Sequence, residues 1–443
     1  MKIDFVDKKV TPFGGFIILK ELLEQMNFEQ AITQMEFPSQ GSNRGYDPAQ
    51  LIIGLMSSIW CGCNCFQQTE IFRHDRGLQE LFGWKHMPGH EAYKRYFNKF
   101  NQSINQRCFT NMYQWLFSNL VFDNYTLDLD STVITRWGEQ EGVAKGYNPR
   151  YKGRKSHHPL LAFIPDCTMV ANCWLRPGNT ADSSGAESFL EDTFQKLKGK
   201  RVGLLRADSG FFSGKILNFL EDREKPISYI IACRFNSGIK RQIVYNQVWM
   251  QVDGTEGIDI AETTYKAEKW ETARRIIIVR QDTTIREKAP GKYLKLTQGC
   301  LFPEEFELDK YRYTCYVTNL SLPSLQIWKL YRGRADSENR IKELKYDFTF
   351  DHFLLRDFWG TEAVMNIITM AYNIVSLLRH VSINTKKKSR LSTIRYEILA
   401  IPGYITKHAN EKVLKLALAL SRRKAFIGLM DNTRNLSSPI HYG

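Results

Sequence analysis

The spacing of apolar residues changes near residue 123, and this change most constrains the fold. Before it, apolar positions recur at three and four, as on helices, in residues 17–26, 49–60 and 109–120. Asp47-Pro48 is a good helix start, an N-cap followed by proline. Residues 125–130 instead alternate as a strand does. The sequence therefore predicts a helical region followed by a part that contains β-strands.

Later apolar runs, short enough for strands, occur at 160–164, 168–175, 201–208 and 227–233. The first two should form a meander with the strand at 125–130. Helical patterns cover 182–197 and 215–220, the second of which Ser213 can cap. Strands that alternate with helices predict an α/β core.

The remaining sequence suggests further segments. Strand-like runs at 244–252, 274–280 and 311–319 predict a β-rich insertion, and residues 325–345 predict one helix after Pro323. A long amphipathic helix is expected at 361–380, a basic linker at 386–390 and a helix at 411–420. We expect five segments: 1–122 (helical, DNA-binding or oligomerising), 123–233 (core, first part), 234–321 (insertion), 322–380 (core, second part) and 381–443 (linker and helical tail).

The charge of the chain suits a polyanionic partner. There are 61 Lys and Arg against 47 Asp and Glu, a formal net charge of +14. The segment 145–155 has two tyrosines, no acids and five cations, namely Lys145, Arg150, Lys152, Arg154 and Lys155. Such a loop suits phosphate contacts, and a solvated surface loop has the same composition. The N-terminal helices are compatible with a DNA-binding head and equally with a plain helical bundle.

Cysteine usage and hydropathy suggest a cytoplasmic protein. The nine cysteines are irregularly placed, which fits a reducing compartment. Cys61, Cys63 and Cys65 admit a zinc site, but buried free thiols fit the pattern better. The start, MKIDFVDKKV, has no apolar run behind its charges, and the apolar segment 51–60 is shorter than the about 20 residues that cross a bilayer.

Acidic residues stand at the ends of two predicted strands. Asp128 and Asp130 share one face of the strand at 125–130, and Asp208 ends the strand at 201–208. Open α/β sheets place functional groups at the carboxyl ends of their strands. An aspartate that only caps the following turn is the alternative, and spacing alone does not choose between Asp128 and Asp130.

The predicted helix at 325–345 adds a third acid. On a helical wheel, Tyr331, Arg334, Glu338 and Lys345 fall within roughly 60° of one another. A solvated, salt-bridged face is the ordinary interpretation of such a strip. Gly333 lies inside the pattern at a cost of about 1 kcal/mol relative to alanine, which suggests a kink or a close backbone approach.

The order strand-Asp, strand-Asp, helix-Glu resembles that of the DDE transposases, which have an RNase H-like core. Tyr331, Arg334, Glu338 and Lys345 match, at every position, the Tyr-x2-Arg-x3-Glu-x6-Lys signature of one large group of bacterial insertion-sequence transposases. Residues 127–132 (LDLDST) and 206–211 (RADSGF) are similar to the two aspartate boxes of that group. A β-rich insertion before the glutamate helix is a further likeness, and the resemblance covers roughly residues 123–380.

The resemblance implies metal-dependent DNA cleavage and strand transfer at the terminal inverted repeats of an insertion sequence. Asp130, rather than Asp128, would then hold Mg²⁺ (Mn²⁺ could substitute) together with Asp208 and Glu338. Without metal, acids so close should raise at least one pKa. Tyr331, Arg334, Lys345 and the 145–155 cations would contact DNA, and the protein would act as a homo-oligomer, a dimer in the simplest case.

Three other functions compete with this one. An RNase H-like nuclease would cut DNA without transposition, and a catalytically inactive descendant of a transposase would only bind DNA. A glycosidase with two facing carboxylates would need neither the cation strip nor the basic loop.

Overall fold

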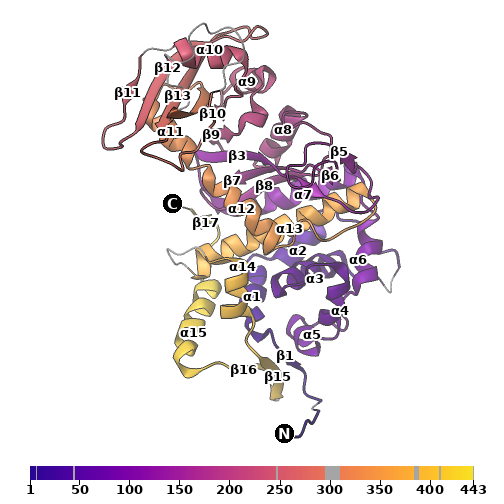
Figure 1. The fold of residues 1–443 in the computed structure, drawn as a ribbon. Helices are drawn as coiled ribbons and strands as arrows, with labels where there is room; N and C mark the ends of the chain where they lie inside the picture. The colour runs from indigo at the N-terminus through magenta and orange to yellow at the C-terminus, as the bar shows by residue number, and fades with distance from the viewer. Residues whose placement is uncertain are drawn as a thin grey trace.

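A nine-stranded mixed sheet organises the molecule, with the strand order β11-β12-β13-β14-β10-β9-β3-β7-β8 (Figure 1). The computed structural model describes residues 1–5, 7–42, 45–245, 248–294, 310–383, 389–408 and 411–442. The strands of this sheet are β3 (Tyr125–Ser131), β7 (Leu160–Ile164), β8 (Met169–Trp174), β9 (Val202–Ala207), β10 (Tyr229–Ala232), β11 (Met250–Gln251), β12 (Ile258–Tyr265), β13 (Arg274–Asp282) and β14 (Tyr311–Thr318).

The centre of the sheet confirms the predicted α/β core. β3, β7 and β8 form the expected antiparallel meander, and β3, β9 and β10 run parallel. The register pairs Leu129 with Ala207, so Asp130 and Asp208 are the next residues along two neighbouring strands. Two helices connect this part, α8 (Ala186–Lys196) and α9 (Gly214–Glu221). Ser213 occupies the N-cap position of α9, but its side chain makes no capping hydrogen bond, contrary to the prediction.

The β-rich segment extends the core sheet and does not form a sheet of its own. β14 pairs with β10, and β13, β12 and β11 follow outward (Figure 1). A strand was expected at 244–252. The start of this range is instead the end of helix α10 (Ser237–Tyr245), and among the described residues of the range only the short β11 is a strand. β12 was not predicted, and residues 295–309 of the segment lie outside the described part. A smaller second core unites these strands with Ile327 and Trp328 of α11 (Ser324–Arg332).

Seven helices precede the sheet within the described residues. They are α1 (Ile17–Gln25), α2 (Phe28–Gln34), α3 (Pro48–Cys61), α4 (Thr69–Arg73), α5 (Arg76–Phe82), α6 (His90–Phe97) and α7 (Gln102–Ser118). Asp47 caps α3 as predicted, since its side chain accepts from the Ala49 N–H at 2.8 Å and Pro48 is the first helical residue.

These helices share one hydrophobic core with the sheet through α13 (Phe358–Leu378). The indole N–H of Trp60 donates to the Ala371 carbonyl at 3.0 Å, and the hydroxyls of Tyr113 and Thr369 are 2.6 Å apart. α13 was expected to be amphipathic, but it is buried from Gly360 to Leu378 because it has the N-terminal helices on one side and β8 on the other. The change at residue 122 is therefore a change of secondary structure and does not separate two cores.

Burial also explains the high hydropathy of this helix. Phe358–Ile383 is long and apolar enough to cross a membrane, and the bent pair Pro48–Cys61 and Phe66–Arg73 passes the same test jointly. The apolar window of Phe358–Ile383 is completely buried inside the protein. Apolar composition on every side of a helix is typical of a core helix as well as of a membrane span.

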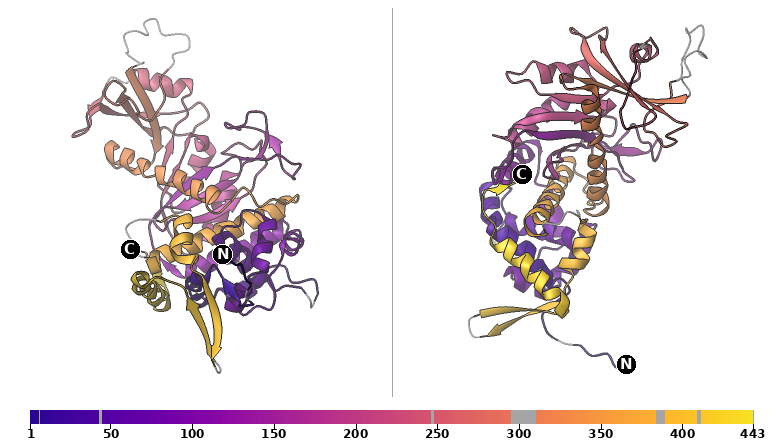
Figure 2. Two further views of the ribbon diagram at one scale, coloured as in Figure 1. Left: turned by 60° about the horizontal axis from the view of Figure 1, so that its bottom comes forward. Right: turned by 90° about the vertical axis from the view of Figure 1, so that its left-hand side faces the viewer.

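The C-terminal segment departs from its predicted helix at 411–420. β15 (Gly403–His408) and β16 (Glu411–Leu416) form a hairpin that pairs with β1 (Val10–Thr11) and projects from the body (Figure 2). Pairing with β15 overrides the helix propensity of Glu, Lys and Leu, which is a weak preference. Lys386–Lys388 of the predicted basic linker lie outside the described residues.

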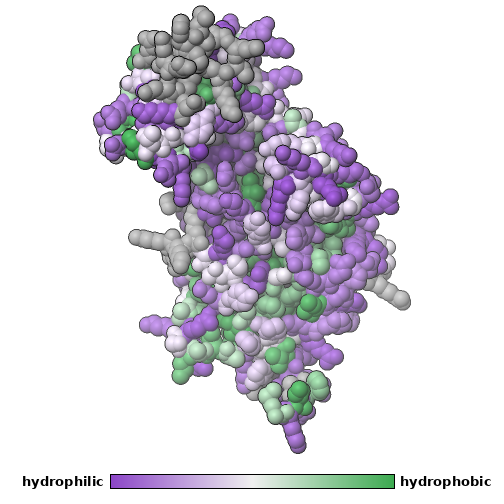
Figure 3. All heavy atoms as spheres, in the orientation of Figure 1, coloured by the Kyte–Doolittle hydropathy of each residue, from purple (hydrophilic) through white to green (hydrophobic). Residues whose placement is uncertain are grey.

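The end of the chain folds back onto the N-terminal helices. α14 (Leu391–Ile394) precedes the hairpin and α15 (Leu420–Arg434) follows it, and β17 (Ile440–His441) pairs with β2 (Leu120–Val121). The face shown in Figure 3 is largely hydrophilic, and apolar side chains gather near its lower end. Leu420 and Ile427 of α15 are strongly exposed.

Candidate active site

The structure brings the predicted acids to the carboxyl ends of β3 and β9. Asp130 lies near the end of β3 and is 8% exposed; its Oδ1 accepts from the Ser131 N–H at 2.9 Å. Asp208 follows β9 and accepts from the Gly210 N–H at 2.8 Å. Glu338 is exposed in the first turn of α12 (Ala335–Tyr346), which packs against the same strand ends.

Electrostatics shows that these acids influence one another. The pKa of Asp130 is raised to about 6, and burial is the largest cause; the nearby charge of Arg334 opposes the rise, and the charges of Asp208 and Glu338 contribute to it. The Arg334 guanidinium lies 3.1 Å from Asp130 Oδ2. A rise of one carboxyl pKa was expected from repulsion between the acids; the pKa of Asp130 is raised, but burial contributes more to the rise than the neighbouring acids do.

Both carboxylate oxygens of the neighbouring Asp128 accept hydrogen bonds from other side chains of the protein. It is fully buried, and Arg206 donates to both of its oxygens, from Nε to Oδ1 at 2.6 Å and from Nη2 to Oδ2 at 2.7 Å. The Ser337 hydroxyl donates to Oδ2 at 2.5 Å. Both oxygens are taken, so the geometry favours Asp130 over Asp128 as the acid of the first box; its role stays a prediction.

The predicted single helix at 325–345 is two helices, α11 and α12, that meet at Gly333 and Arg334. Arg206 Nη1 donates to the Leu330 carbonyl at 2.5 Å, and a Cβ built on Gly333 would lie 2.7 Å from this Nη1. Gly333 thus permits the close approach anticipated from the sequence. The Asp128–Arg206 pair docks this junction onto the sheet.

The other signature residues reach backbone carbonyls beside the aspartates. Tyr331 donates to the Ala207 carbonyl at 3.4 Å, Arg334 to the Leu129 carbonyl at 3.1 Å, and Lys345 to the Val133 carbonyl at 3.1 Å. Burial raises the pKa of Tyr331 to about 12, and burial lowers the pKa of Lys345. In this conformation the three side chains hold the strand ends and do not form an exposed strip.

A cleft of about 700 Å³ opens beside Asp208, and its lining includes Lys345 and part of the basic loop. Arg150 is the predicted loop cation in this lining. The remaining loop cations do not line the cleft themselves: Arg154 stacks over Trp137, which does line it, Lys155 pairs with Glu139 at 2.7 Å, and Lys145 and Lys152 are exposed.

A second polar cluster in this cleft was not predicted. Asp182 Oδ1 accepts from the Ser131 hydroxyl at 2.6 Å and lies 3.2 Å from His158 Nε2. A Cβ on Gly210 would lie 2.4 Å from Asp182 Oδ2, so this carboxylate touches both aspartate boxes. Hydrogen bonds from His158 and Ser131 hold the pKa of Asp182 at about 2. His158 follows the basic loop and Asp182 precedes α8, and no spacing rule links the two.

Arg176 fixes the loop that carries Asp182. Its Nη1 lies within 3.2 Å of the carbonyl oxygens of Ala181, Asp182 and Ser184, and its Nε donates to the His158 carbonyl at 3.0 Å. This buried clamp makes the Asp182 loop a rigid wall of the cleft.

No three His, Cys, Asp or Glu side chains in the described part of the chain lie close enough together to hold a metal ion. The donor set of Asp130, Asp208 and Glu338 nevertheless suits a hard cation, since it is all oxygen. Cys61 and Cys63 are buried, and burial raises the pKa of both thiols, that of Cys63 to about 12, as fits free thiols.

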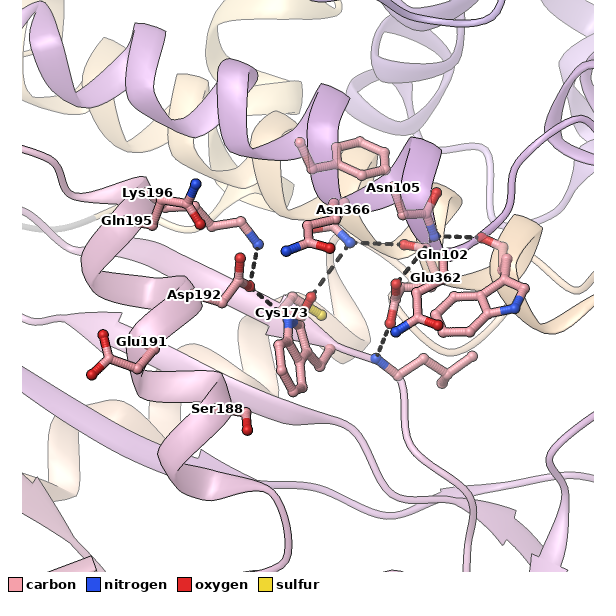
Figure 4. Close-up of a pocket in the computed structure, with 15 residues that line it drawn as sticks. Gln102, Asn105, Cys173, Ser188, Glu191, Asp192, Gln195, Lys196, Glu362 and Asn366 are labelled. Atoms are coloured by element: carbon pink, nitrogen blue, oxygen red, sulfur yellow. Dashed lines mark hydrogen bonds and ion pairs between the residues drawn. The ribbon is translucent and has the colours of Figure 1, made fainter. Parts of the chain in front are cut away.

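A second cavity, of about 770 Å³, lies between α7, α8, β8 and α13 and contains none of the predicted site residues (Figure 4). The side chain of Glu362 lines this cavity. Its Oε1 accepts a hydrogen bond from Asn105 Nδ2 at 3.1 Å, and its Oε2 accepts one from the Leu175 N–H at 2.9 Å. Burial raises the pKa of Glu362 to about 7. The hydrogen bonds of its polar side chains connect the N-terminal helices to the sheet, and we call this region the joint.

Comparison with known proteins assigns the family. No curated protein matches the chain. One similar solved structure is a cryo-EM structure of a piggyBac transposase synaptic complex with hairpin DNA, at 12% identity and a TM-score of 0.43, covering 86% of this chain and 78% of that one. That likeness is too weak to support an assignment. The family model described as transposase DDE domain group 1, in contrast, matches residues 1–438, and the chain therefore belongs to this family of transposases.

Proposed function

We propose that this protein binds the terminal inverted repeats of an insertion sequence and carries out cut-and-paste transposition by metal-dependent strand cleavage and strand transfer. One observation carries the proposal: Asp130 and Asp208 follow paired positions of adjacent parallel strands, and both Asp208 and Glu338 act on the pKa of Asp130. Acids that converge from two strands and a helix are what a cation site for phosphodiester chemistry requires.

The core is proposed to be RNase H-like. In support, the order β8-β7-β3-β9-β10 combines an antiparallel meander with two further strands parallel to β3. In this proposal β11–β14 are an insertion that extends the sheet edge beyond β10.

We propose that Asp130, Asp208 and Glu338 hold Mg²⁺, for which Mn²⁺ can substitute. Such ions activate the attacking oxygen and stabilise the leaving oxygen when bound. Arg334 lies 3.1 Å from Asp130 and offsets part of the negative charge of the three acids. Tyr331 and Lys345 hold the carbonyls of Ala207 and Val133, and so position the ends of both strands.

Double-stranded DNA, both transposon end and target, is the proposed partner. The cleft beside Asp208 measures about 700 Å³ and is lined by Arg150 and Lys345, and the chain carries a net charge of +14. A homo-oligomer, a dimer in the simplest case, would hold two DNA ends together. A cytoplasmic location in a bacterial cell belongs to the same proposal.

The test is to incubate the purified full-length protein and Mg²⁺ with DNA from the flanks of its own gene, and to map the breaks. Cuts at the ends of the element, followed by joining of a cut end into a plasmid, would support transposition. Cuts without joining would identify a nuclease that does not transpose. Binding to the ends without metal-dependent cutting would identify an inactive DNA-binding protein, and either outcome would refute the proposal.

A further inference from the structure

Four aromatic side chains in the lining of the cleft, which together we call its aromatic wall, are more exposed than large rings normally are. Trp137, Tyr147 and Tyr346 have 69%, 73% and 72% of their surface accessible, and Tyr151 has 39%. All four line the cavity of about 700 Å³ that also contains Asp208. Exposed large apolar side chains that gather in one place mark a binding surface, whereas scattered ones need no explanation.

Two arginines of the basic loop lie over two of these rings. The guanidinium of Arg154 is 4.7 Å from the ring centroid of Trp137, and that of Arg150 is 5.4 Å from the centroid of Tyr151. The two rings meet edge to face, with centroids 5.6 Å apart. Cation–π contacts orient a ring without burying it. The wall therefore offers flat apolar faces bordered by positive charge.

The ligand that fits such a wall has flat rings and negative charge. The segment 145–155 contains five cations and no acid, so it favours an anion. Nucleic acid supplies phosphates for the cations and bases for the rings, and stacking of bases on aromatic side chains tolerates any sequence. In a duplex the base faces cover one another, so only bases that have left the duplex can stack on protein rings.

We propose that Trp137, Tyr147, Tyr151 and Tyr346 form a stacking platform for unpaired nucleobases of the DNA in the cleft. The inference rests on the proposed function, which brings DNA to this cavity, and it narrows the substrate to DNA whose strands are locally separated. A base stacked here lies in the same cavity as Asp208 and positions the adjoining phosphates next to the acids.

The test compares two fluorescein-labelled duplexes from the flanks of the gene, one fully paired and one with mismatched thymines near its end. Binding of the full-length protein is measured by anisotropy in EDTA, so that the DNA stays uncut. The wild type should bind the mismatched duplex about tenfold more tightly, the order of magnitude of one base–aromatic stack. Trp137→Ala and Tyr346→Ala should lose this preference while binding paired DNA nearly unchanged.

Tyr396→Ala is the matched control, because Tyr396 is 77% exposed but does not line the cleft, and it should keep the full preference. The platform is overturned if both cleft variants keep the preference, or if they weaken binding to both duplexes equally. It is also overturned if they abolish a dimer while the base preference is unchanged, because the wall would then be an interface between two copies.

The same assay separates this inference from the proposed function. A wild type that binds and, with Mg²⁺, cuts paired DNA but shows no preference for mismatched DNA refutes the platform alone. A wild type that binds neither duplex refutes both.

Discussion

Two cavities of similar size each lie next to a buried acid, and the surroundings of the two acids differ. The cleft beside Asp208 measures about 700 Å³ and the joint around Glu362 about 770 Å³. Each has next to it a carboxyl group with a raised pKa, about 6 for Asp130 and about 7 for Glu362. At Asp130, the charges of Arg334 and Asp208 shift the pKa more than the hydrogen bond from Ser131 does. At Glu362, the hydrogen bonds from the Leu175 N–H and the Asn105 amide shift the pKa more than the charges of Lys196 and Asp192 do. A raised pKa alone therefore does not locate chemistry, and the dominance of nearby charges over hydrogen bonds is the better indicator.

The largest expected effect is the loss of cleavage on replacing Asp130, which lies beside the cleft. Asp130→Asn should reduce the rate of DNA cleavage by about a thousandfold or more, because under the proposed function it removes a metal ligand worth several kcal/mol. Glu362→Gln, the matched change in the joint, should leave the cleavage rate within a few-fold of wild type. The measurement is single-turnover cleavage of end DNA in Mg²⁺. Equal losses in both variants would mean that the comparison between the cavities is wrong.

The second-largest expected effect is a loss of stability when the Asp128–Arg206 ion pair is broken. Arg206→Ala leaves the fully buried Asp128 without its charged partner, which should cost about 3–5 kcal/mol in the free energy of unfolding. Lys155→Ala breaks the exposed pair with Glu139 and should cost less than about 1 kcal/mol. Urea denaturation measures both. A small cost for Arg206→Ala would show that Asp128 is not a structural acid and would reopen its candidacy for the site.

Much of the core was predictable because its signals are local. The alternation that places Asp128 and Asp130 on β3, and the N-cap at Asp47, depend on residues within a few positions of one another. The order of the acids predicted one site formed by Asp130, Asp208 and Glu338, and the structure places Asp130 and Asp208 at neighbouring strand ends. The pairing of Asp182 with His158 and Ser131 escaped prediction because it depends on how two loops cross in space.

The β-rich insertion was predicted, but its pairing with the core sheet and the C-terminal hairpin were not, for a related reason. β14 pairs with β10 across a long stretch of chain, so no local pattern shows that the insertion joins the core sheet. The burial of α13 on all sides likewise depends on α3 and β8, which lie far from it in sequence. The C-terminal hairpin runs against the helix propensity of its own residues, and its pairing with β1 connects opposite ends of the chain.

A smaller effect is the pH dependence of stability at the joint. The folded-state pKa of Glu362, about 7, lies above its usual value of 4.5. Its contribution to stability is therefore fully present below about pH 4.5 and is lost as the pH rises to 7, by up to about 3 kcal/mol. Thermal melting between these pH values should show a decline in the wild type that Glu362→Gln reduces. A decline of the same size in the variant would place the pH dependence elsewhere.

The smallest effect tests whether Lys345 contacts DNA or only holds the strand end. Its Nζ donates to the Val133 carbonyl, yet the side chain lines the cleft, so both roles are open to it. If Lys345 neutralises a phosphate, Lys345→Ala should lower the slope of log K against log salt by about 0.9 for every DNA sequence. Lys342→Ala is the control, since Lys342 is exposed on the same helix and does not line the cleft. An unchanged slope combined with a lower melting temperature would assign Lys345 to the support of Val133 alone, and the cleft would then depend on Arg150 for its contact with phosphate.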